Sequence, residues 1–315
     1  MRILAFAIPE FGTIFLETML RSNKNIVGVV LPPVNHNSYI PTKAVAKSFG
    51  LPLIEAGKNL KDLRLVEEIN NYKPDVILIA AYPRLIPPEI YTIPSLGTIN
   101  CHPSLLPDYR GANPYFHVIR NGETKTGITF HYLDDTFDTG DIISQWIVPI
   151  IPNETLGTLY LRLSFKSCEL YLNIVEKLEN LKHGERLEAS PQPPDTGHYK
   201  TSPEIKPNSK EMNINWSESS FSIDCLVRAC NPYFGATTIY RGMPTKIWSG
   251  IINDKPKYRP SKPPGTIVKV TNSELEVATG SGLYSPLCIQ QGMLFITDIK
   301  DFIKRNNPKV GEMLN

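Results

Sequence analysis

Short apolar runs constrain the fold of this chain more than any other feature. They are rich in Val, Ile and Leu and do not alternate with polar residues, and they cover residues 2–8, 26–31, 75–80 and 97–102. This pattern is typical of strands that are buried on both faces, as in a parallel sheet. Helix-like stretches separate the runs, at residues 11–21, 41–49 and 60–71. The alternation predicts a doubly wound, Rossmann-like α/β domain with right-handed crossovers.

The pattern continues with two strands and a long helix before the composition changes. Residues 127–133 and 142–149 are predicted as strands, and residues 155–182 as an amphipathic helix that ends at Gly184. A proline-rich stretch with few large aliphatic residues follows, which is typical of a linker. We therefore expect a first domain over residues 1–190 and a linker over residues 191–206.

The remaining residues, 207–315, are predicted to form a second domain. Residues 215–231 have the pattern of one helix. Short β-like runs separated by Gly and Pro follow it, at residues 237–242, 245–252, 265–270, 274–280 and 288–296. Several short strands at such spacing predict a small β-barrel of the OB-like kind.

Composition excludes several classes of protein. The formal net charge is only +2, so a protein that coats a polyanion such as DNA is not expected. No apolar run reaches 18 residues, so no membrane span is expected. The five cysteines are scattered and form no CxxC pair, which argues against a disulfide framework or a zinc site. A reducing cytoplasm is therefore the expected compartment.

Nucleotide-binding motifs are absent from the expected positions. The first strand is followed by Ile8-Pro9-Glu10-Phe11-Gly12 rather than by a G-x-G-x-x-G turn, and the chain holds no G-x-x-x-x-G-K-[ST] sequence. The phosphates of dinucleotides and nucleoside triphosphates are bound by those glycine-rich turns. Both ligand classes are therefore poor candidates despite the Rossmann-like alternation.

The strongest candidate site lies where the fourth apolar run ends. Asn100 and His102 stand two residues apart on a predicted strand, so their side chains point to the same side. Ligands bind at the carboxyl ends of strands in open α/β sheets. Asp138 follows in a turn between two predicted strands. An amide N–H for an oxyanion, an imidazole for proton transfer and a carboxylate that orients the imidazole suit acyl transfer.

Structural roles remain open for each of these residues. A histidine at a strand end and an aspartate in a turn are more often packing and capping groups. Cys101 points to the other face and is expected in the core, and His117 and His131 are expected to be structural. No third ligand accompanies His102 and Asp138 at a metal-binding spacing, so no metal is expected.

Long motifs carry a family resemblance. The stretch N-C-H-P-S-L-L-P-D-Y-R-G at 100–111, followed by F-D-T-G-D at 137–141, resembles the signature of the 10-formyltetrahydrofolate-dependent formyltransferases. The start of the chain and NGETKTGIT at 121–129 are similar to the methionyl-tRNA formyltransferase branch. INWS at 214–217, RACNPYFGA at 228–236 and PGTIVKV at 264–270 resemble that branch's C-terminal domain. Glycinamide ribonucleotide formyltransferases share the catalytic motif but lack this domain.

The resemblance implies the roles of individual residues. Asn100, His102 and Asp138 match the family's catalytic triad, in which an acceptor amine attacks the formyl carbon. Asn100 and protonated His102 would stabilise the oxyanion, while Asp138 would hold His102 and help to move protons. The residues that match the folate-binding segments are Arg84, Leu85, Ile86, Ser104, Leu105, Leu106 and Pro107. The implied co-substrate is 10-formyltetrahydrofolate.

One segment departs from the methionyl-tRNA branch. That branch usually carries a longer, basic loop after its second strand, whereas residues 32–42 of this chain are short and contain no Lys or Arg. Contacts to phosphates supply much of the affinity for a nucleic acid. The neutral loop is more similar to the amino-sugar formyltransferases, which formylate a nucleotide-linked amine.

Four functions are therefore weighed. Formylation of methionyl-tRNA is favoured by the full-length match and by a mildly basic second domain. The basic residues of this second domain include Lys255, Lys257, Arg259, Lys262, Lys300, Lys304 and Arg305. Formylation of an amino-sugar nucleotide is favoured by the neutral loop. A non-catalytic RNA- or folate-binding module is disfavoured because such a module has no need of the triad. A formyl-folate hydrolase is disfavoured because it has no need of the C-terminal domain.

Overall fold

The computed structural model describes all residues except 9, 33–39, 183 and 254–261, and it divides into two compact units. Unit 1 comprises Met1–Pro114, Lys125–Pro149 and Tyr160–Pro203. Unit 2 comprises Tyr115–Thr124, Ile150–Leu159 and Glu204–Asn315. The domain limits expected from the sequence, at 190 and 207, stay predictions.

Unit 1 is built on a seven-stranded sheet in the order β3-β2-β1-β4-β5-β6-β7. Its strands are β1 (Ile3–Ala7), β2 (Ile26–Leu31), β3 (Leu53–Glu55), β4 (Val76–Ala80), β5 (Thr98–His102), β6 (Lys125–Tyr132) and β7 (Ile142–Pro149). The first five strands are parallel, and β6 and β7 are antiparallel to their neighbours. Every residue of β1 and β4 is buried, as their continuous apolar sequences predicted.

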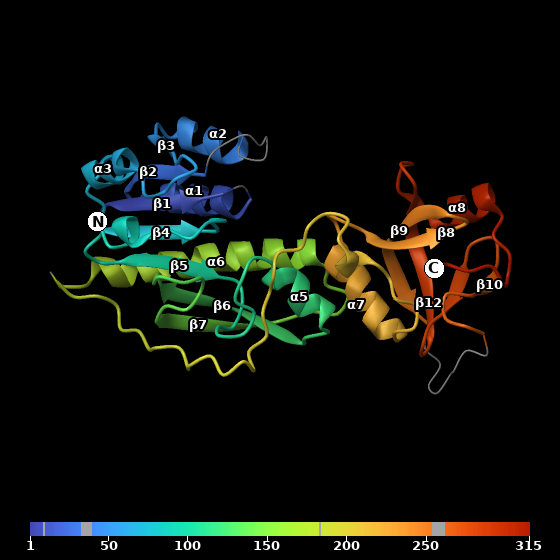
Figure 1. Cartoon of the computed structure of the whole chain (residues 1–315). Coiled ribbons are helices and arrows are strands. Elements are labelled where there is room, and N and C mark those ends of the chain that lie inside the picture. The colour runs from blue at the N-terminus through green and yellow to red at the C-terminus, as the bar shows by residue number, and fades with distance from the viewer. Residues whose placement is uncertain (9, 33–39, 183, 254–261) are drawn as a thin grey trace. The chain divides into compact units, whose positions relative to one another are not determined.

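Helices cover both faces of this sheet (Figure 1). They are α1 (Phe11–Arg21), α2 (Ile40–Ser48), α3 (Leu63–Asn71), α4 (Pro88–Tyr91) and the long α6 (Leu156–Glu179). On one face, the rings of Phe15 in α1 and Tyr171 in α6 meet edge to face at 4.9 Å. On the other face, Ile69 of α3 and Ile90 of α4 pack in a cluster with Phe6 of β1. The predicted doubly wound fold is confirmed. No helix in the described part of the chain is long and apolar enough to cross a membrane.

Unit 2 holds an antiparallel sheet in the order β10-β11-β12-β9-β8, with β13 paired to β12. Its strands are β8 (Ala236–Tyr240), β9 (Met243–Ile252), β10 (Ile267–Val270), β11 (Leu275–Ala278), β12 (Leu283–Gln291) and β13 (Thr297–Asp298). Its helices are α7 (Ser220–Cys230) and α8 (Ile299–Asn306), together with a 3-10 turn at Lys210–Met212. Helix α5 (Pro114–Arg120) belongs to this unit from Tyr115 onward.

The last residues of the chain close this sheet into a barrel. Strands β8 and β10 are the two edges of the sheet, and the C-terminal segment pairs with both. Ile239 exchanges two backbone hydrogen bonds with Asn315, at 2.7 and 2.9 Å. On the other side, Ile267 N–H donates to the carbonyl of Glu312 and Leu314 N–H donates to that of Gly265. The predicted barrel is confirmed, and its closure removes both exposed edges.

Several element boundaries differ from the sequence-based expectation. Helix α7 begins at Ser220 rather than at residue 215, because the hydroxyl of Ser219 accepts from the Ser222 N–H and caps the helix there. Trp216 lies before this cap and is buried. Helix α6 ends at Glu179, before the expected residue 182. Strand β3 and helices α4, α5 and α8 were not predicted, and β3, α4 and α5 are too short to give a periodic signal.

Barrel closure makes Leu314 a sensitive position. Its side chain is 3% exposed, whereas that of Met313 is 42% exposed. We expect Leu314→Ala to lower the free energy of unfolding of unit 2 by about 2–4 kcal/mol, because truncation leaves a cavity in the core. Met313→Ala, the matched control, should cost under about 1 kcal/mol. Calorimetric unfolding of both variants measures the difference, and equal losses would contradict the closure.

Candidate active site

The strand end at β5 presents two of the predicted residues on one face. Asn100 and His102 point to the same side, and Cys101 between them points to the other. Cys101 pairs across the sheet with Phe130 of β6, whose ring packs on Tyr171 of α6 at 4.7 Å. Burial raises the pKa of the Cys101 thiol well above its ordinary value. Cys101 is therefore a packing residue and is not a nucleophile.

The turn between β6 and β7 holds Asp138 in a left-handed conformation, with φ of 58°. Such a backbone angle is uncommon outside glycine and needs local support. The carboxylate of Asp134 supplies part of it by accepting from the Thr139 hydroxyl at 2.7 and 2.8 Å. Gly140 supplies another part, because a Cβ there would lie 1.9 Å from the carbonyl oxygen of Tyr132. The turn sequence therefore fixes where the Asp138 carboxylate points.

The structure brings the three predicted triad residues together. Asp138 Oδ1 lies 3.4 Å from Asn100 Nδ2 and 3.4 Å from His102 Nδ1. The second carboxylate oxygen, Oδ2, accepts a hydrogen bond of 3.0 Å from the Gly111 N–H. The side chains of His102 and Asp138 are 6% and 10% exposed. Their assignment as catalytic groups stays a prediction, but their geometry suits proton transfer at a nearly dry site.

His131 joins this cluster, although the sequence indicated only a structural role for it. It stands directly opposite Asn100 in the β5–β6 register and is 2% exposed. Its Nε2 lies 3.1 Å from Asn100 Nδ2 and 3.7 Å from Asp138 Oδ1. The missing signal was the pairing of β5 with β6, since an antiparallel neighbour places a residue of the same face beside Asn100.

The charge states of the cluster follow from burial and proximity. Burial is the largest influence on His102 and lowers its pKa, while attraction to Asp138 opposes that effect. Burial raises the pKa of Asp138, but attraction to His102 and the hydrogen bond from the Gly111 N–H are among the influences that outweigh it and lower the pKa to about 2. The cluster therefore contains an ionised carboxylate beside a His102 ring that favours its neutral form.

The hydrogen bonds of His102 show which ring nitrogen is available. Its Nε2 lies 2.8 Å from the carbonyl oxygen of Tyr109, which can only accept, so Nε2 carries a proton. In the neutral ring Nδ1 is then the basic atom, and it faces Asp138. A proton that arrives at Nδ1 is stabilised by the carboxylate, so the pair can take up a proton during a reaction.

A segment that the sequence suggested to be a linker holds this site in place. We call residues 190–203 the strap. Ser190 exchanges two backbone hydrogen bonds with Ile142 at the start of β7, at 2.8 and 2.9 Å. The Gln192 amide group donates to the carbonyl oxygens of Asp138 and Gly140, both at 2.9 Å. The strap therefore supports the turn that carries the carboxylate.

The strap also holds the loop that follows β5. Thr201 forms a parallel bridge with Arg110, and Tyr109 N–H donates to the carbonyl of Lys200 at 2.6 Å. The guanidinium of Arg110 donates to the Asp138 carbonyl and to the Gln192 side chain, at 3.1 and 2.5 Å. One segment thus ties together the backbone around His102, through Tyr109, and the backbone of Asp138.

The predicted folate-binding residues are found in two kinds of environment. Leu85 is 41% exposed, and Leu105 and Pro107 are half-buried, so their side chains have surface to offer a ligand. Ile86, Ser104 and Leu106 are at most 3% exposed, and a ligand would meet them through the backbone or after a local rearrangement.

Arg84 and the backbone of Leu106 already have protein partners. Arg84 donates to the carbonyl oxygens of Gly57 and Lys58. Leu106 N–H donates to the Thr129 hydroxyl at 3.2 Å, and its carbonyl accepts from Gln145 at 2.7 Å. These bonds hold the loop in shape, and the predicted contacts of Arg84 and Leu106 with folate stay predictions.

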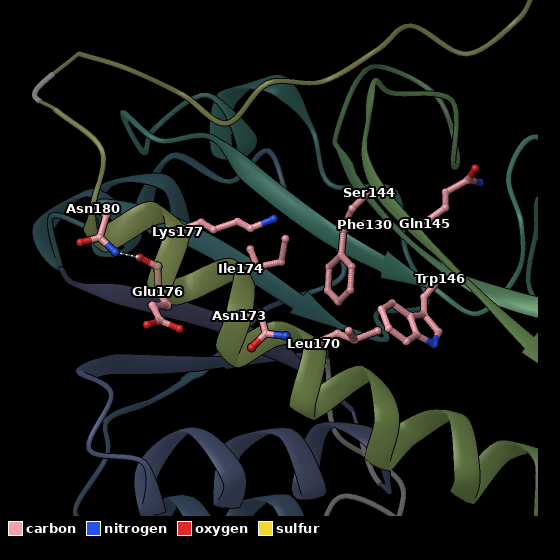
Figure 2. A pocket seen from close by; sticks show the side chains of 10 residues that line it. All are labelled: Phe130, Ser144, Gln145, Trp146, Leu170, Asn173, Ile174, Glu176, Lys177 and Asn180. Atoms are coloured by element: carbon pink, nitrogen blue, oxygen red, sulfur yellow. Dashed lines mark hydrogen bonds between the residues drawn. The ribbon is translucent and has the colours of Figure 1, made fainter.

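A separate cavity lies on the opposite face of the sheet, beneath α6 (Figure 2). Its volume is about 520 Å³. Phe130, Ser144 and Trp146 of the sheet line it together with Ile174 and Lys177 of α6. Asn100, His102 and Asp138 are not among its lining residues, so this cavity is distinct from the candidate site. Among the described residues, no group of three or more metal-ligating side chains is arranged to hold a metal ion.

Comparison with known proteins identifies the family. The model of the formyl transferase family matches residues 20–175, and that of the formyl transferase C-terminal domain matches residues 206–307. The methionyl-tRNA formyltransferase of Syntrophus aciditrophicus is 32% identical over 99% of this chain and 98% of its own length. The chain therefore belongs to the formyl transferase family, and the predicted class of enzyme is confirmed.

Solved structures share the fold at lower identity. The N-formyltransferase from Helicobacter canadensis, in complex with folinic acid and dTDP-3-aminofucose, has a TM-score of 0.67 and 20% identity. The match covers 92% of this chain and 98% of that one. HypX from Aquifex aeolicus has a TM-score of 0.63 and 17% identity; the match covers 99% of this chain but spans only 50% of that chain.

The protonation of His102 can be measured directly. We expect the His102 imidazole to titrate below pH 6.5, because burial disfavours its charged form. Asp138→Asn should lower this midpoint further, since the variant removes the attraction that stabilises the imidazolium. Titration of the ring by NMR measures both midpoints. A midpoint that rises in Asp138→Asn would contradict the assigned pairing.

The strap should matter to turnover even though it lies outside the triad. We expect Gln192→Ala to lower formyl-transfer turnover by about tenfold or more, because small displacements of a reacting group are costly. The matched control is Asp195→Ala, an exposed residue of the same segment. Unfolding curves should be similar for the two variants. Unchanged turnover in Gln192→Ala would show that the Asp138 turn needs no support from the strap.

Proposed function

We propose that the protein transfers the formyl group of 10-formyltetrahydrofolate to the free amine of methionyl-tRNA. The similarity to curated methionyl-tRNA formyltransferases, which extends over 99% of the chain, carries this proposal. The convergence of Asn100, His102 and Asp138 at a strand end supports the chemistry. Asp138 Oδ1 lies 3.4 Å from each partner, a long contact of the kind that is common in catalytic groups before substrate binds.

The arrangement supports a separate role for each of the three residues. The neutral His102 ring takes a proton at Nδ1 as the acceptor amine forms its bond to the formyl carbon. The bond between the formyl carbon and N10 of the folate then breaks, and the proton passes from His102 to N10 as tetrahydrofolate leaves. Asp138 stabilises the charge that this proton brings. The amide group of Asn100 orients the formyl oxygen and stabilises the negative charge that develops on it. Because burial favours a neutral His102 in the free protein, the protonated form expected from the resemblance is one reached during the reaction.

The loop after β5 and the segment after β4 fit a folate co-substrate. A flat, largely apolar ring needs exposed aliphatic surface and fixed polar groups around it. Leu85 and Leu105 offer such surface near the strand ends, and Thr129 and Gln145 fix the backbone of Leu106. The bound folate supplies the formyl group, and we propose that these residues orient it toward His102.

Unit 2 is proposed to bind the acceptor. Its exposed cations within the described residues include Lys262, Lys300, Lys304 and Arg305. Lys255, Lys257 and Arg259 lie outside the described residues, as do residues 33–39 of the neutral loop. Cationic side chains on this unit suit contacts to the phosphates of an RNA, which position the acceptor without reading its sequence.

A sugar-nucleotide amine is the second candidate acceptor. The observation in its favour is the lack of Lys and Arg in residues 32–42. The N-formyltransferase from Helicobacter canadensis, which has the same overall fold, was solved in complex with dTDP-3-aminofucose, an amino-sugar nucleotide. The triad would work in the same way with either amine.

The acceptor is tested by assaying purified protein with 10-formyltetrahydrofolate and charged initiator methionyl-tRNA. We expect rapid transfer at low salt that weakens steeply as salt rises, because phosphate contacts release counterions. His102→Ala should lower turnover by about a hundredfold or more. An amino-sugar nucleotide serves as the parallel substrate. Transfer to the sugar nucleotide alone, without salt dependence, would refute the tRNA proposal and select the second candidate.

A further inference from the structure

His131 lies beside Asn100 in the candidate site and is not one of the three proposed triad residues. Its side chain is 2% exposed, so water cannot satisfy its ring nitrogens. Both nitrogens therefore depend on protein groups. The groups that face the ring are Asn100 on β5, Asp138 in the β6–β7 turn and the carbonyl of Tyr132.

The tautomer of His131 follows from these partners. Its Nδ1 lies 2.8 Å from the carbonyl oxygen of Tyr132, which can only accept, so Nδ1 carries the proton. In the neutral ring Nε2 is then an acceptor. Asn100 Nδ2 lies 3.1 Å from this atom and donates to it. The Tyr132 carbonyl thereby determines what His131 offers to Asn100.

The amide of Asn100 consequently has one favourable orientation. With Nδ2 toward His131, the amide also places its N–H group 3.4 Å from the Asp138 carboxylate. Rotating the amide by half a turn would bring its oxygen against the lone pair of His131 Nε2 and against the ionised carboxylate. Both contacts would be repulsive in a buried environment, where electrostatic interactions are strong.

We propose that His131 is a positioning residue that fixes the Asn100 amide for formyl transfer. This inference rests on the proposed catalytic role of Asn100. His131 acts through Asn100, and it keeps the amide in one orientation before substrate binds. His131 holds one N–H of Asn100, and the other, which lies at a long 3.4 Å from Asp138, is the one available to the formyl oxygen as charge develops on it.

Substitution with and without a hydrogen-bond acceptor tests the proposal. His131→Phe keeps a ring but removes the acceptor, and we expect it to lower kcat by about tenfold or more with little change in KM for the folate. His131→Gln retains an acceptor oxygen and should recover most of the loss. The assay uses the acceptor on which the wild-type protein is active, so an error in the proposed acceptor does not affect it.

A double-mutant cycle separates positioning from packing. If His131 acts through Asn100, then His131→Phe should cause little further loss in a protein that already carries Asn100→Ala. The proposal is overturned if the fold-losses in kcat of the two single variants multiply in the double variant. It is also overturned if His131→Phe and His131→Gln lose kcat equally. If Asn100→Ala instead leaves the rate at its wild-type value, the proposed catalytic role of Asn100 is wrong.

A measurement on the wild-type protein covers the case in which a variant does not fold. The nitrogen chemical shifts of the His131 ring report its tautomer, and we expect a proton on Nδ1 and none on Nε2. This readout needs neither acceptor nor activity. A proton on Nε2 would leave the ring unable to accept from Asn100 and would overturn the inference.

Discussion

The buried charge of Asp138 is the constraint on which the rest of the site depends. An ionised carboxylate away from water is costly unless polar partners surround it. Here the Gly111 N–H and the Asn100 amide donate to the carboxylate, and attraction to His102 helps to lower the pKa of Asp138 to about 2 despite burial. The left-handed turn and the fixed loop after β5 bring these partners within reach. Much of the local architecture thus stabilises one charge.

This charge also explains why a neutral His102 suits the site. Burial is the largest influence on His102 and lowers its pKa. Attraction to the Asp138 carboxylate opposes this effect, so the imidazolium can still form. A base must be unprotonated before the reaction and must tolerate a proton during it. The opposition between burial and attraction meets both needs, since either influence alone would hold the ring in one state.

Local sequence patterns predicted most of unit 1 and three residues of the site. The buried strands were visible as continuous apolar runs, and the rule that ligands bind at strand ends pointed to Asn100 and His102. The turn between two predicted strands added Asp138 as a candidate, and the family resemblance then implied its role. His131 and Gln192 were missed because each acts across a long separation in sequence. One depends on the antiparallel register of β5 and β6, and the other on the path of a proline-rich segment, which no periodicity encodes.

The strap limits where unit 1 can be joined to the second unit of another protein. Proline-rich stretches between domains are usually regarded as inert tethers, so a recombined enzyme would be joined within them. Gln192 bonds to the Asp138 carbonyl and Lys200 to the Tyr109 N–H. A crossover before these residues would replace the supports of the carboxylate with foreign sequence. A chimera that gives this catalytic unit a new acceptor-binding domain should therefore retain the native chain through Pro203.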